Sequence, residues 1–170
     1  MRFHSAPVVR LADAKRVELI EALRADGRWR LLAFADRSTP SDPGSAIARL
    51  CAFLESSPTS PLVRHTPKGT DVDSVFDVLA VMQQGHRDLD VGAMPKLLRP
   101  RRGRYGLIDH EKIFCPDLKT GPDVFDLRGI DRDRGALVIV RPDQYVGHVL
   151  PLDAHEDLAA YFAAFLLPIA

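Results

Sequence analysis

The chain has 170 residues, and its 23 Lys and Arg residues balance 23 Asp and Glu residues. With 46% hydrophobic residues, this length predicts one domain, residues 1–170, with a core that needs no disulfide bonds. A formal net charge of zero argues against nucleic acid or an anionic membrane as partner, because proteins that bind these usually carry a basic excess.

The two cysteines, Cys51 and Cys115, lie far apart and form no CxxC or zinc-type spacing. So few cysteines are typical of a reducing compartment, and we expect a cytoplasmic protein. The N-terminal segment lacks the apolar stretch of a signal peptide. No apolar run approaches the ~20 residues that a membrane span requires.

The first elements alternate between strands and helices. Residues 6–11 predict a short edge strand, and the spacing of apolar residues in 13–24 predicts a helix. The nearly continuous apolar run WRLLAFAD, residues 29–36, predicts a central strand buried on both faces. Residues 45–56 predict a helix with one apolar face.

The remaining chain combines buried strands with long polar connections. Strands are expected at residues 75–82 and 136–140, with an antiparallel return at 145–152. Connections are expected at 57–72, 83–103 (irregular and basic) and 115–123. Short elements are expected at 106–108 (strand) and 124–130 (helical turn), and a closing helix is expected at 155–167.

This order predicts an α/β fold of the thioredoxin-like type, with a mixed sheet flanked by helices on both faces. A strand–helix–strand unit gives neighbouring parallel strands through a right-handed crossover. A hairpin and a final helix then complete the sheet, and the Pro142-Asp143 corner makes the hairpin turn.

Thiol redox chemistry in such a fold needs a low-pKa cysteine where the first core strand meets its helix. Here residues 36–42 contain no cysteine, and no proline stands at 132–135 before the third strand. We expect Cys51 to be a small buried hydrophobic residue and Cys115 an incidental thiol in a loop. The fold is therefore predicted without redox activity.

Four segments resemble the C-terminal domain of the phenol hydroxylase family, which are FAD-dependent aromatic monooxygenases of the phenol 2-monooxygenase kind. They are RFHSAPVVRLADAK (2–15), DGRWRLLAFAD (26–36), RGIDRDRGALVIVRPDQYVGHVLPL (128–152) and AAYFAAFLLP (159–168). The resemblance implies a thioredoxin-like domain that lacks redox cysteines and takes part in dimer contacts. It also implies that FAD and phenol are held by preceding domains.

The 170 residues contain no GxGxxG after a strand, so we predict no flavin site on this chain. An excised C-terminal domain and a stand-alone relative remain equally open. The family's turn usually carries glycine where Gln144 stands. A positive φ would strain Gln144, so a modified turn is expected there.

Other polar segments are interpreted mainly as structural. The basic stretch 96–104 reads as a solvated or interdomain surface, with docking to an acidic surface or to phosphate as alternatives. We interpret residues 141–145 as a turn, and the alternative is that they make a charged contact with a flavoprotein. None of the six histidines has HExxH spacing, and Asp109-His110-Glu111 should diverge. The closing helix should pack on the sheet, with only its rim free to pair.

We therefore expect a non-catalytic dimerisation module that self-associates as a homodimer or docks on a flavoprotein monooxygenase. No catalytic, cofactor-binding or metal-binding residue is predicted. Two alternatives stay open: a small-molecule domain in which 57–72 and 83–103 shape an aromatic pocket, and a divergent thiol peroxidase using Cys51 or Cys115.

Overall fold

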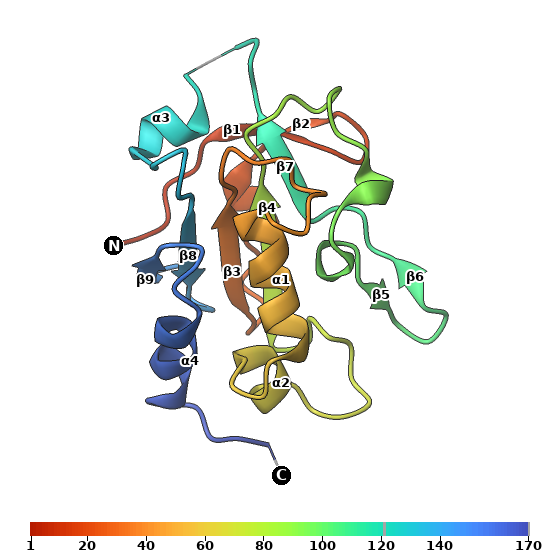
Figure 1. Ribbon diagram of the computed structural model, residues 1–170, viewed down its shortest axis with the longest axis vertical. Coiled ribbons are helices and arrows are strands. Elements are labelled where there is room, and N and C mark those ends of the chain that lie inside the picture. The colour runs from red at the N-terminus through yellow and green to blue at the C-terminus, as the bar shows by residue number, and fades with distance from the viewer. Residues whose placement is uncertain (121, 170) are drawn as a thin grey trace.

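A computed structural model describes residues 1–120 and 122–169. Its centre is a mixed seven-stranded sheet in the order β2-β1-β7-β4-β3-β8-β9 (Figure 1). The strands of this sheet are β1 (Pro7–Arg10), β2 (Arg16–Glu18), β3 (Trp29–Phe34), β4 (Phe76–Val81), β7 (Ile113–Pro116), β8 (Ala136–Val140) and β9 (Val146–Leu150). A separate two-stranded sheet pairs β5 (Arg101–Arg102) with β6 (Leu107–Ile108).

Four α-helices and three short 3₁₀ helices accompany the strands in the described part of the chain. The α-helices are α1 (Ala46–Ser56), α2 (Pro61–His65), α3 (Val124–Arg128) and α4 (His155–Ala163). The 3₁₀ helices are η1 (Leu19–Ala22), η2 (Val91–Ala93) and η3 (Lys96–Leu98). No helix among the described residues is both long enough and apolar enough to cross a membrane.

The sheet is built around β3, as the apolar run at residues 29–36 predicts. β3 pairs in parallel with β4 and antiparallel with β8, through registers such as Leu31↔Val78 and Leu31↔Ile139. Successive side chains of a strand point to opposite faces, so Leu31 and Leu32 enter two different hydrophobic clusters. Both leucines are fully buried, which explains why this strand lacks alternating polar residues.

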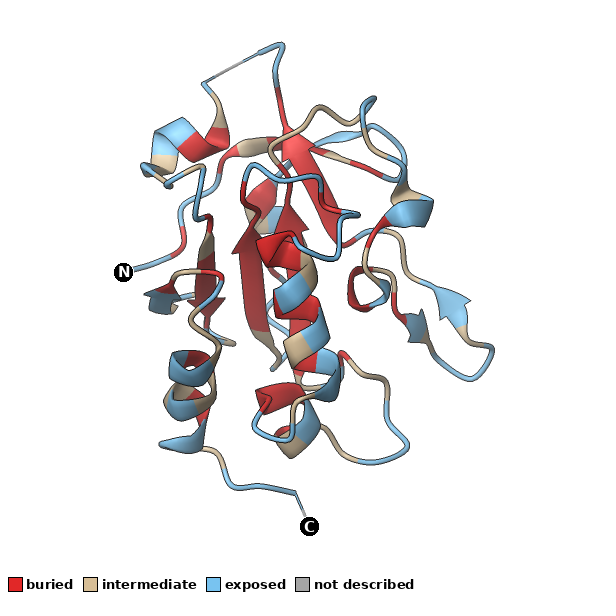
Figure 2. Cartoon of the chain, viewed as in Figure 1, coloured by how far each residue is buried: buried red, intermediate tan, exposed pale blue. Residues whose placement is uncertain are grey.

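Different elements pack on the two faces of the sheet. α1 crosses one face, with α2 and α4 beside it (Figure 1), and it contributes Ile47, Leu50 and Leu54 to the larger cluster. The other face is covered by η1, α3 and the N-terminal segment, which contribute Leu19 and Phe125 among others. The buried residues concentrate in the central strands and on the inner side of α1 (Figure 2).

α1 confirms the helix predicted at residues 45–56. The Ser45 side chain accepts a hydrogen bond from the Ala48 backbone N–H at 3.2 Å, which satisfies a donor that the first helical turn leaves unpaired. The Asp36 carboxylate accepts a second one, from the Ala46 N–H at 3.1 Å. These two caps join the end of β3 to the start of α1.

The helix predicted at residues 13–24 is wrong. The chain turns at Ala14, whose φ is 56°, and then forms β2 and η1. β2 pairs antiparallel with β1 through Val8↔Val17, so strand pairing overrides the helical spacing of apolar residues. β1 is consequently flanked by β2 and β7 and is not the edge strand that was expected.

Two predicted connections also contain regular structure. Residues 113–116 form β7 between β1 and β4, so Cys115 lies in a buried strand and not in a loop. Residues 61–65 form α2, which Ser60 caps by accepting from the Leu62 N–H. A four-residue strand and a five-residue helix are too short for periodicity to reveal. The closing helix ends at Ala163, earlier than predicted.

The hairpin turn between β8 and β9 has the strained geometry that we did not expect. Gln144 has a φ of 65°, so the turn keeps the backbone form that glycine would adopt more easily. The Gln144 N–H donates to the Arg141 carbonyl at 2.9 Å, which closes the turn. Its side-chain Nε2 donates to the Leu23 carbonyl at 2.6 Å, a bond that offsets part of the strain and that glycine lacks.

Candidate functional site

The corner between β3 and α1, where a redox cysteine would stand, is filled by structural contacts. Gln83 Nε2 donates to the Ala35 carbonyl at 2.9 Å and to the Arg132 carbonyl at 2.7 Å. Gly135 lies against β3, where an added Cβ would come within 2.4 Å of the Phe34 carbonyl oxygen. In the described chain no peptide bond is cis. The corner holds the sheet together and presents no thiol.

The two cysteines lack the properties of reactive thiols. Cys51 lies on the buried face of α1, inside the core, and Cys115 is buried in β7. Burial raises the pKa of Cys51 well above its usual range, and the Glu55 carboxylate raises it further. Burial and the Asp88 charge raise the pKa of Cys115 to about 12. Because the thiolate is the nucleophile, these environments argue against the thiol peroxidase alternative.

Four charged side chains meet on the α3 side of the sheet, at the amino ends of the parallel strands. Arg30 on β3 is paired in register with Asp77 on β4, and its Nε lies 3.2 Å from Asp77 Oδ2. Lys112, just before β7, donates through Nζ to Asp77 Oδ1 and to Asp73 Oδ2, the latter at 2.8 Å. All four side chains are buried. Buried charges of this kind need the partners that they have here.

The charged cluster extends outward through two further arginines and two aspartates. Arg28 Nη2 lies 2.7 Å from Asp26 Oδ2, and Arg30 Nη2 lies 2.9 Å from the same oxygen. Arg102 bridges Asp73, at 3.2 Å, and Asp109, at 3.0 Å. We call this set the charged cluster: Asp26, Arg28, Arg30, Asp73, Asp77, Arg102, Asp109 and Lys112.

The cluster lowers the pKa of its outer carboxyl groups. Burial acts to raise the pKa of Asp109, but the Glu111 backbone N–H, the Lys112 ammonium and Arg102 together outweigh it and lower that pKa. The hydrogen bonds from Arg28 and Arg30 likewise outweigh burial at Asp26 and bring its pKa well below the usual range. Both groups are therefore held as carboxylates in the folded protein.

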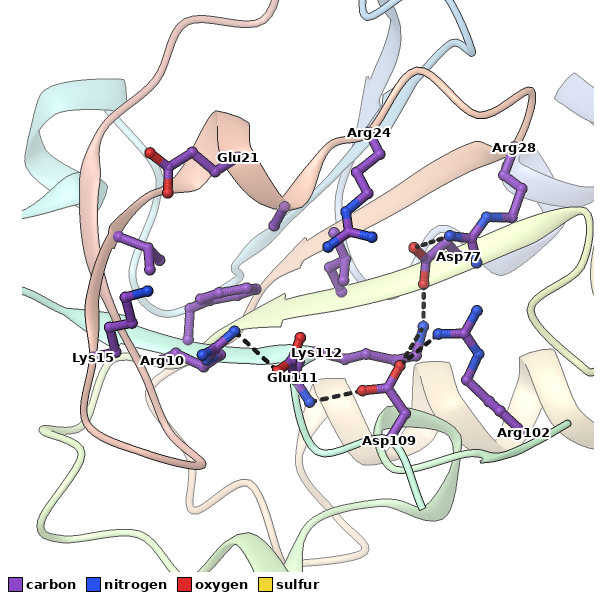
Figure 3. A pocket seen from close by; sticks show the side chains of 14 residues that line it. Arg10, Lys15, Glu21, Arg24, Arg28, Asp77, Arg102, Asp109, Glu111 and Lys112 are labelled. Atoms are coloured by element: carbon purple, nitrogen blue, oxygen red, sulfur yellow. Dashed lines mark hydrogen bonds and ion pairs between the residues drawn. The ribbon is translucent and has the colours of Figure 1, made fainter. Parts of the chain in front are cut away.

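A cavity of about 260 Å³ opens beside the cluster, between η1 and the strands (Figure 3). Arg24 points toward it from the chain after η1, and Glu111 contacts Arg10 on its far side at 3.2 Å. Each carboxylate contributed by Asp77, Asp109 and Glu111 has a cation beside it. This arrangement suits fixing strands in place more than transferring protons.

The sequence did not predict this arrangement. Asp109 and Glu111 lie between β6 and β7 and line the same cavity, where Asp109 pairs with Arg102 and Glu111 pairs with Arg10, so the divergence expected for a strand does not apply. The cluster itself was missed, although a signal exists. WRLL and FDVL each place a charged residue at the second position of an otherwise apolar strand. Such a residue is costly to bury unless a partner stands beside it, so two of them on neighbouring strands indicate a pair.

An aromatic surface lies at the β9 edge of the sheet, where β9 is the outermost strand. His148 stacks on Tyr161 with ring centroids 5.4 Å apart, and Tyr161 and Trp29 each lie within 5.5 Å of Phe165. Phe165 is 49% exposed and Val149 is 54% exposed. Val149 faces the other side of the sheet from His148, because its partner Val138 belongs to the second hydrophobic cluster and Ile139, the partner of His148, belongs to the first. We call Trp29, His148, Tyr161 and Phe165, together with Val149 beside His148 on β9, the aromatic edge.

Two predictions for this surface are confirmed. Phe162 of α4 is buried on the sheet, whereas Phe165, just beyond the end of α4, stays exposed, which agrees with the expectation that only the rim of this segment is free. Arg141 Nη2 pairs with Asp143 Oδ2 at 2.7 Å within the turn, and Asp143 Oδ1 accepts from the Tyr145 N–H at 3.3 Å. Corner 141–145 is thus a turn beside the aromatic edge, and Gln144 and Tyr145 also tie it to Leu23 and to the N-terminal segment.

The basic stretch 96–104 runs through η3 into the β5–β6 hairpin. Residues of the two predicted excursions do meet, around a hollow of about 470 Å³ lined by Val72, Leu97 and Ile108 among others. The histidines remain dispersed, and the described residues contain no group of three or more His, Cys, Asp or Glu side chains placed to hold a metal ion.

Comparison with known proteins identifies the family. Residues 1–170 match the model of the family described as phenol hydroxylase, C-terminal dimerisation domain. The chain belongs to this family. The resemblance in the four segments is therefore confirmed, and it extends over the whole chain.

Two curated relatives show the setting of the domain. The chain is 54% identical, over 98% of its length, to 3-hydroxybenzoate 4-monooxygenase of Comamonas testosteroni, and it covers 26% of that protein. It is 35% identical, over 98% of its length, to the FAD-dependent monooxygenase terD of Aspergillus terreus, and it covers 27% of that protein. The phenol hydroxylase dimerisation domain thus spans about a quarter of these relatives.

The thioredoxin-like fold is also confirmed. A putative protein disulfide isomerase from Bacteroides thetaiotaomicron superimposes with a TM-score of 0.53 and 16% identity, covering 96% of this chain and 84% of that one. At this level of identity the likeness concerns the fold alone. The phenol hydroxylase dimerisation domain keeps that fold without a CxxC motif.

Proposed function

We propose that this domain associates two copies of a flavin-dependent aromatic monooxygenase in the cytoplasm, and that flavin and substrate bind outside these 170 residues. The observation that carries the proposal is an open, partly apolar sheet edge on a domain of the dimerisation family. The filled corner beside Gly135 and the two buried, free cysteines support a non-catalytic role.

The aromatic edge is the surface that best fits self-association. The N-terminal segment pairs only with the first part of β9, through the Arg2↔Tyr145 bridge and the bond from the Val146 N–H to the Met1 carbonyl. The rest of β9 is the outermost strand of the described sheet. An exposed antiparallel edge can pair with the same edge of a second copy about a two-fold axis, and Phe165 and Val149 would then be covered.

Light scattering after size exclusion tests this proposal, with an absorbance scan to 500 nm on the same peak. We expect a colourless dimer. Val149→Lys and Phe165→Glu should each shift the peak to monomer, because a charge at a strand edge or in an apolar interface opposes pairing. Leu127→Lys is the matched control, since Leu127 is 53% exposed on α3, away from this edge.

The outcomes distinguish an error in the contact surface from an error in the proposed function. A dimer that survives both edge substitutions would refute the aromatic edge as the contact. A monomer at every concentration would refute self-association by the domain alone. A yellow peak would refute the assignment of flavin to another part of the protein.

The hollow between the two excursions supports a second candidate, binding of a small aromatic molecule. Its lining combines Leu97 and Ile108 with polar groups such as Glu55, a mixture common in ligand pockets. Ligand-detected NMR with phenol should then show saturable binding that Ile108→Asp abolishes. Binding that does not saturate, or that Ile108→Asp leaves unchanged, would exclude this candidate.

A further inference from the structure

The β5–β6 hairpin projects from the body of the domain as an arm, which we define as residues 99–108. It stands outside the seven-stranded sheet, on the side opposite β9 (Figure 1). Tyr105 is 78% exposed and Leu107 is 70% exposed, and Ile108 is exposed as well. Large apolar side chains gathered on a projecting hairpin are typical of a contact surface.

The arm is anchored to the body of the domain even though side chains at its turn are uncovered. At the start of that turn, the Gly103 N–H donates to both carboxylate oxygens of Asp71, at 3.0 and 3.1 Å. Arg102 joins the charged cluster through Asp73 and Asp109, and the Asp109 N–H donates to the Pro100 carbonyl at 2.9 Å. A hairpin with two residues in each strand is marginal by itself, so these bonds set its outward position.

The arm carries a strong local positive charge. Residues 91–108 contain five Lys or Arg residues and no Asp or Glu. Of these cations, Lys96, Arg99, Arg101 and Arg104 have no carboxylate within 4 Å in the described chain. The Arg104 guanidinium lies 5.3 Å from the centre of the Tyr105 ring, so charge and aromatic surface are presented together.

We infer that this arm docks on the flavoprotein part of a full-length monooxygenase, at an apolar surface rimmed by acidic side chains. The inference rests on the proposed function. Two arms brought together would place like charges opposite each other, which argues against a second copy as the occupant. The chain covers only 26% of its 54%-identical relative, so most of such a protein lies outside the structure. Tyr and Arg are residues enriched at the centres of protein contacts.

A matched pair of proteins tests the inference. One is the 170-residue chain alone. The other is the full-length Comamonas testosteroni 3-hydroxybenzoate 4-monooxygenase with this chain in place of its C-terminal quarter. The double variant Tyr105→Ser/Leu107→Ser and the variant Arg101→Glu/Arg104→Glu are made in both, and their thermal unfolding and oligomeric state are measured.

In the isolated chain we expect both variants to unfold at the wild-type midpoint within 2 °C or so, since these side chains are exposed there. In the full-length hybrid both should lower the midpoint clearly and leave the dimer intact. The variants Leu127→Ser and Arg134→Glu, at exposed positions away from the arm, are the controls. Trypsin cleavage after Arg104 should also be at least tenfold slower in the wild-type hybrid, a measurement that needs no substitution.

Equal midpoint shifts in both proteins, or none in either, would overturn the inference. So would equally fast cleavage after Arg104. Conversion of the hybrid to monomer by the arm variants would instead assign the arm to a second copy. If Val149→Lys converts the hybrid to a monomer and the arm variants still lower its unfolding midpoint by the same amount, then the arm and the aromatic edge act separately.

Discussion

The two ends of the parallel strands β3, β4 and β7 are built in opposite ways. At the carboxyl end, hydrogen bonds to the backbone and close packing fill the corner: the Gln83 amide bonds two carbonyls, the Asp36 carboxylate caps α1, and Gly135 lies directly against the Phe34 carbonyl. At the amino end, Arg30, Asp77 and Lys112 form buried ion pairs. The carboxyl end is where the ligands of open α/β sheets usually bind.

The two ends of the sheet therefore suit different purposes. The carboxyl-end corner lacks the thiol that a redox site needs. The amino end holds a network that joins β3, β4 and the residue before β7 and that reaches the arm through Arg102. The domain is thereby shaped to hold surfaces in place, which is what association requires.

The largest effect should come from breaking the amino end. Asp77→Ala leaves Lys112 and Arg30 buried with one carboxylate fewer, and we expect it to reduce the free energy of unfolding by about 3–5 kcal/mol. Asp133→Ala, which removes an exposed pair with Arg37, should cost less than about 1 kcal/mol. Urea unfolding measures both. Similar losses in the two variants would mean that the cluster does not stabilise the sheet.

Breaking the carboxyl end should have the next largest effect. In Gly135→Ala the new Cβ meets the Phe34 carbonyl oxygen and Leu152 at a positive φ of 64°. We expect a loss of about 2–4 kcal/mol. Gly129→Ala, at φ 60° with open space around it, should cost only about 1 kcal/mol. Equal losses would show that backbone strain, and not the close approach of β3, decides the requirement.

The smallest expected effect is a dependence of the unfolding free energy on pH. It bears on the comparison because the charged cluster lies at the amino end of the strands. The lowered pKa values of Asp26 and Asp109 mean that the unfolded chain takes up protons first as pH falls below about 4. Stability should therefore be lost between pH 4 and pH 2. In Asp109→Asn the slope of unfolding free energy against pH should be shallower over this interval. An unchanged slope would contradict the role of Asp109.

The long apolar runs made the centre of the fold predictable. Residues 29–36 and 75–82 each have a single interpretation, because a buried strand of this length leaves a continuous apolar signal. Ser45 and the apolar stripe after it located α1 equally well. The order of elements then predicted the thioredoxin-like fold, and the family resemblance implied the same fold.

The short and non-local features could not be predicted. β2 shares apolar spacing with a helix, and only its pairing with β1 decides its form. β7 has four residues, and its burial depends on β1 and β4 arriving on both sides. The charged cluster joins residues from four separate segments, so no local window contains it. The aromatic edge was partly predictable, because the closing helix was expected to pack on the sheet with only its rim free, and Phe162 is buried whereas Phe165 is exposed.

The position of β1 has a consequence for how the chain folds. Val8 pairs with Val17 nearby, but on its other side it pairs with Pro116, far along the sequence. Contacts of such large sequence separation slow folding, since a long loop must close before they form. During synthesis the β1–β2 hairpin therefore emerges before β7 and keeps one edge unpaired until β7 has left the ribosome. The first strand of this domain is among the last to be completed.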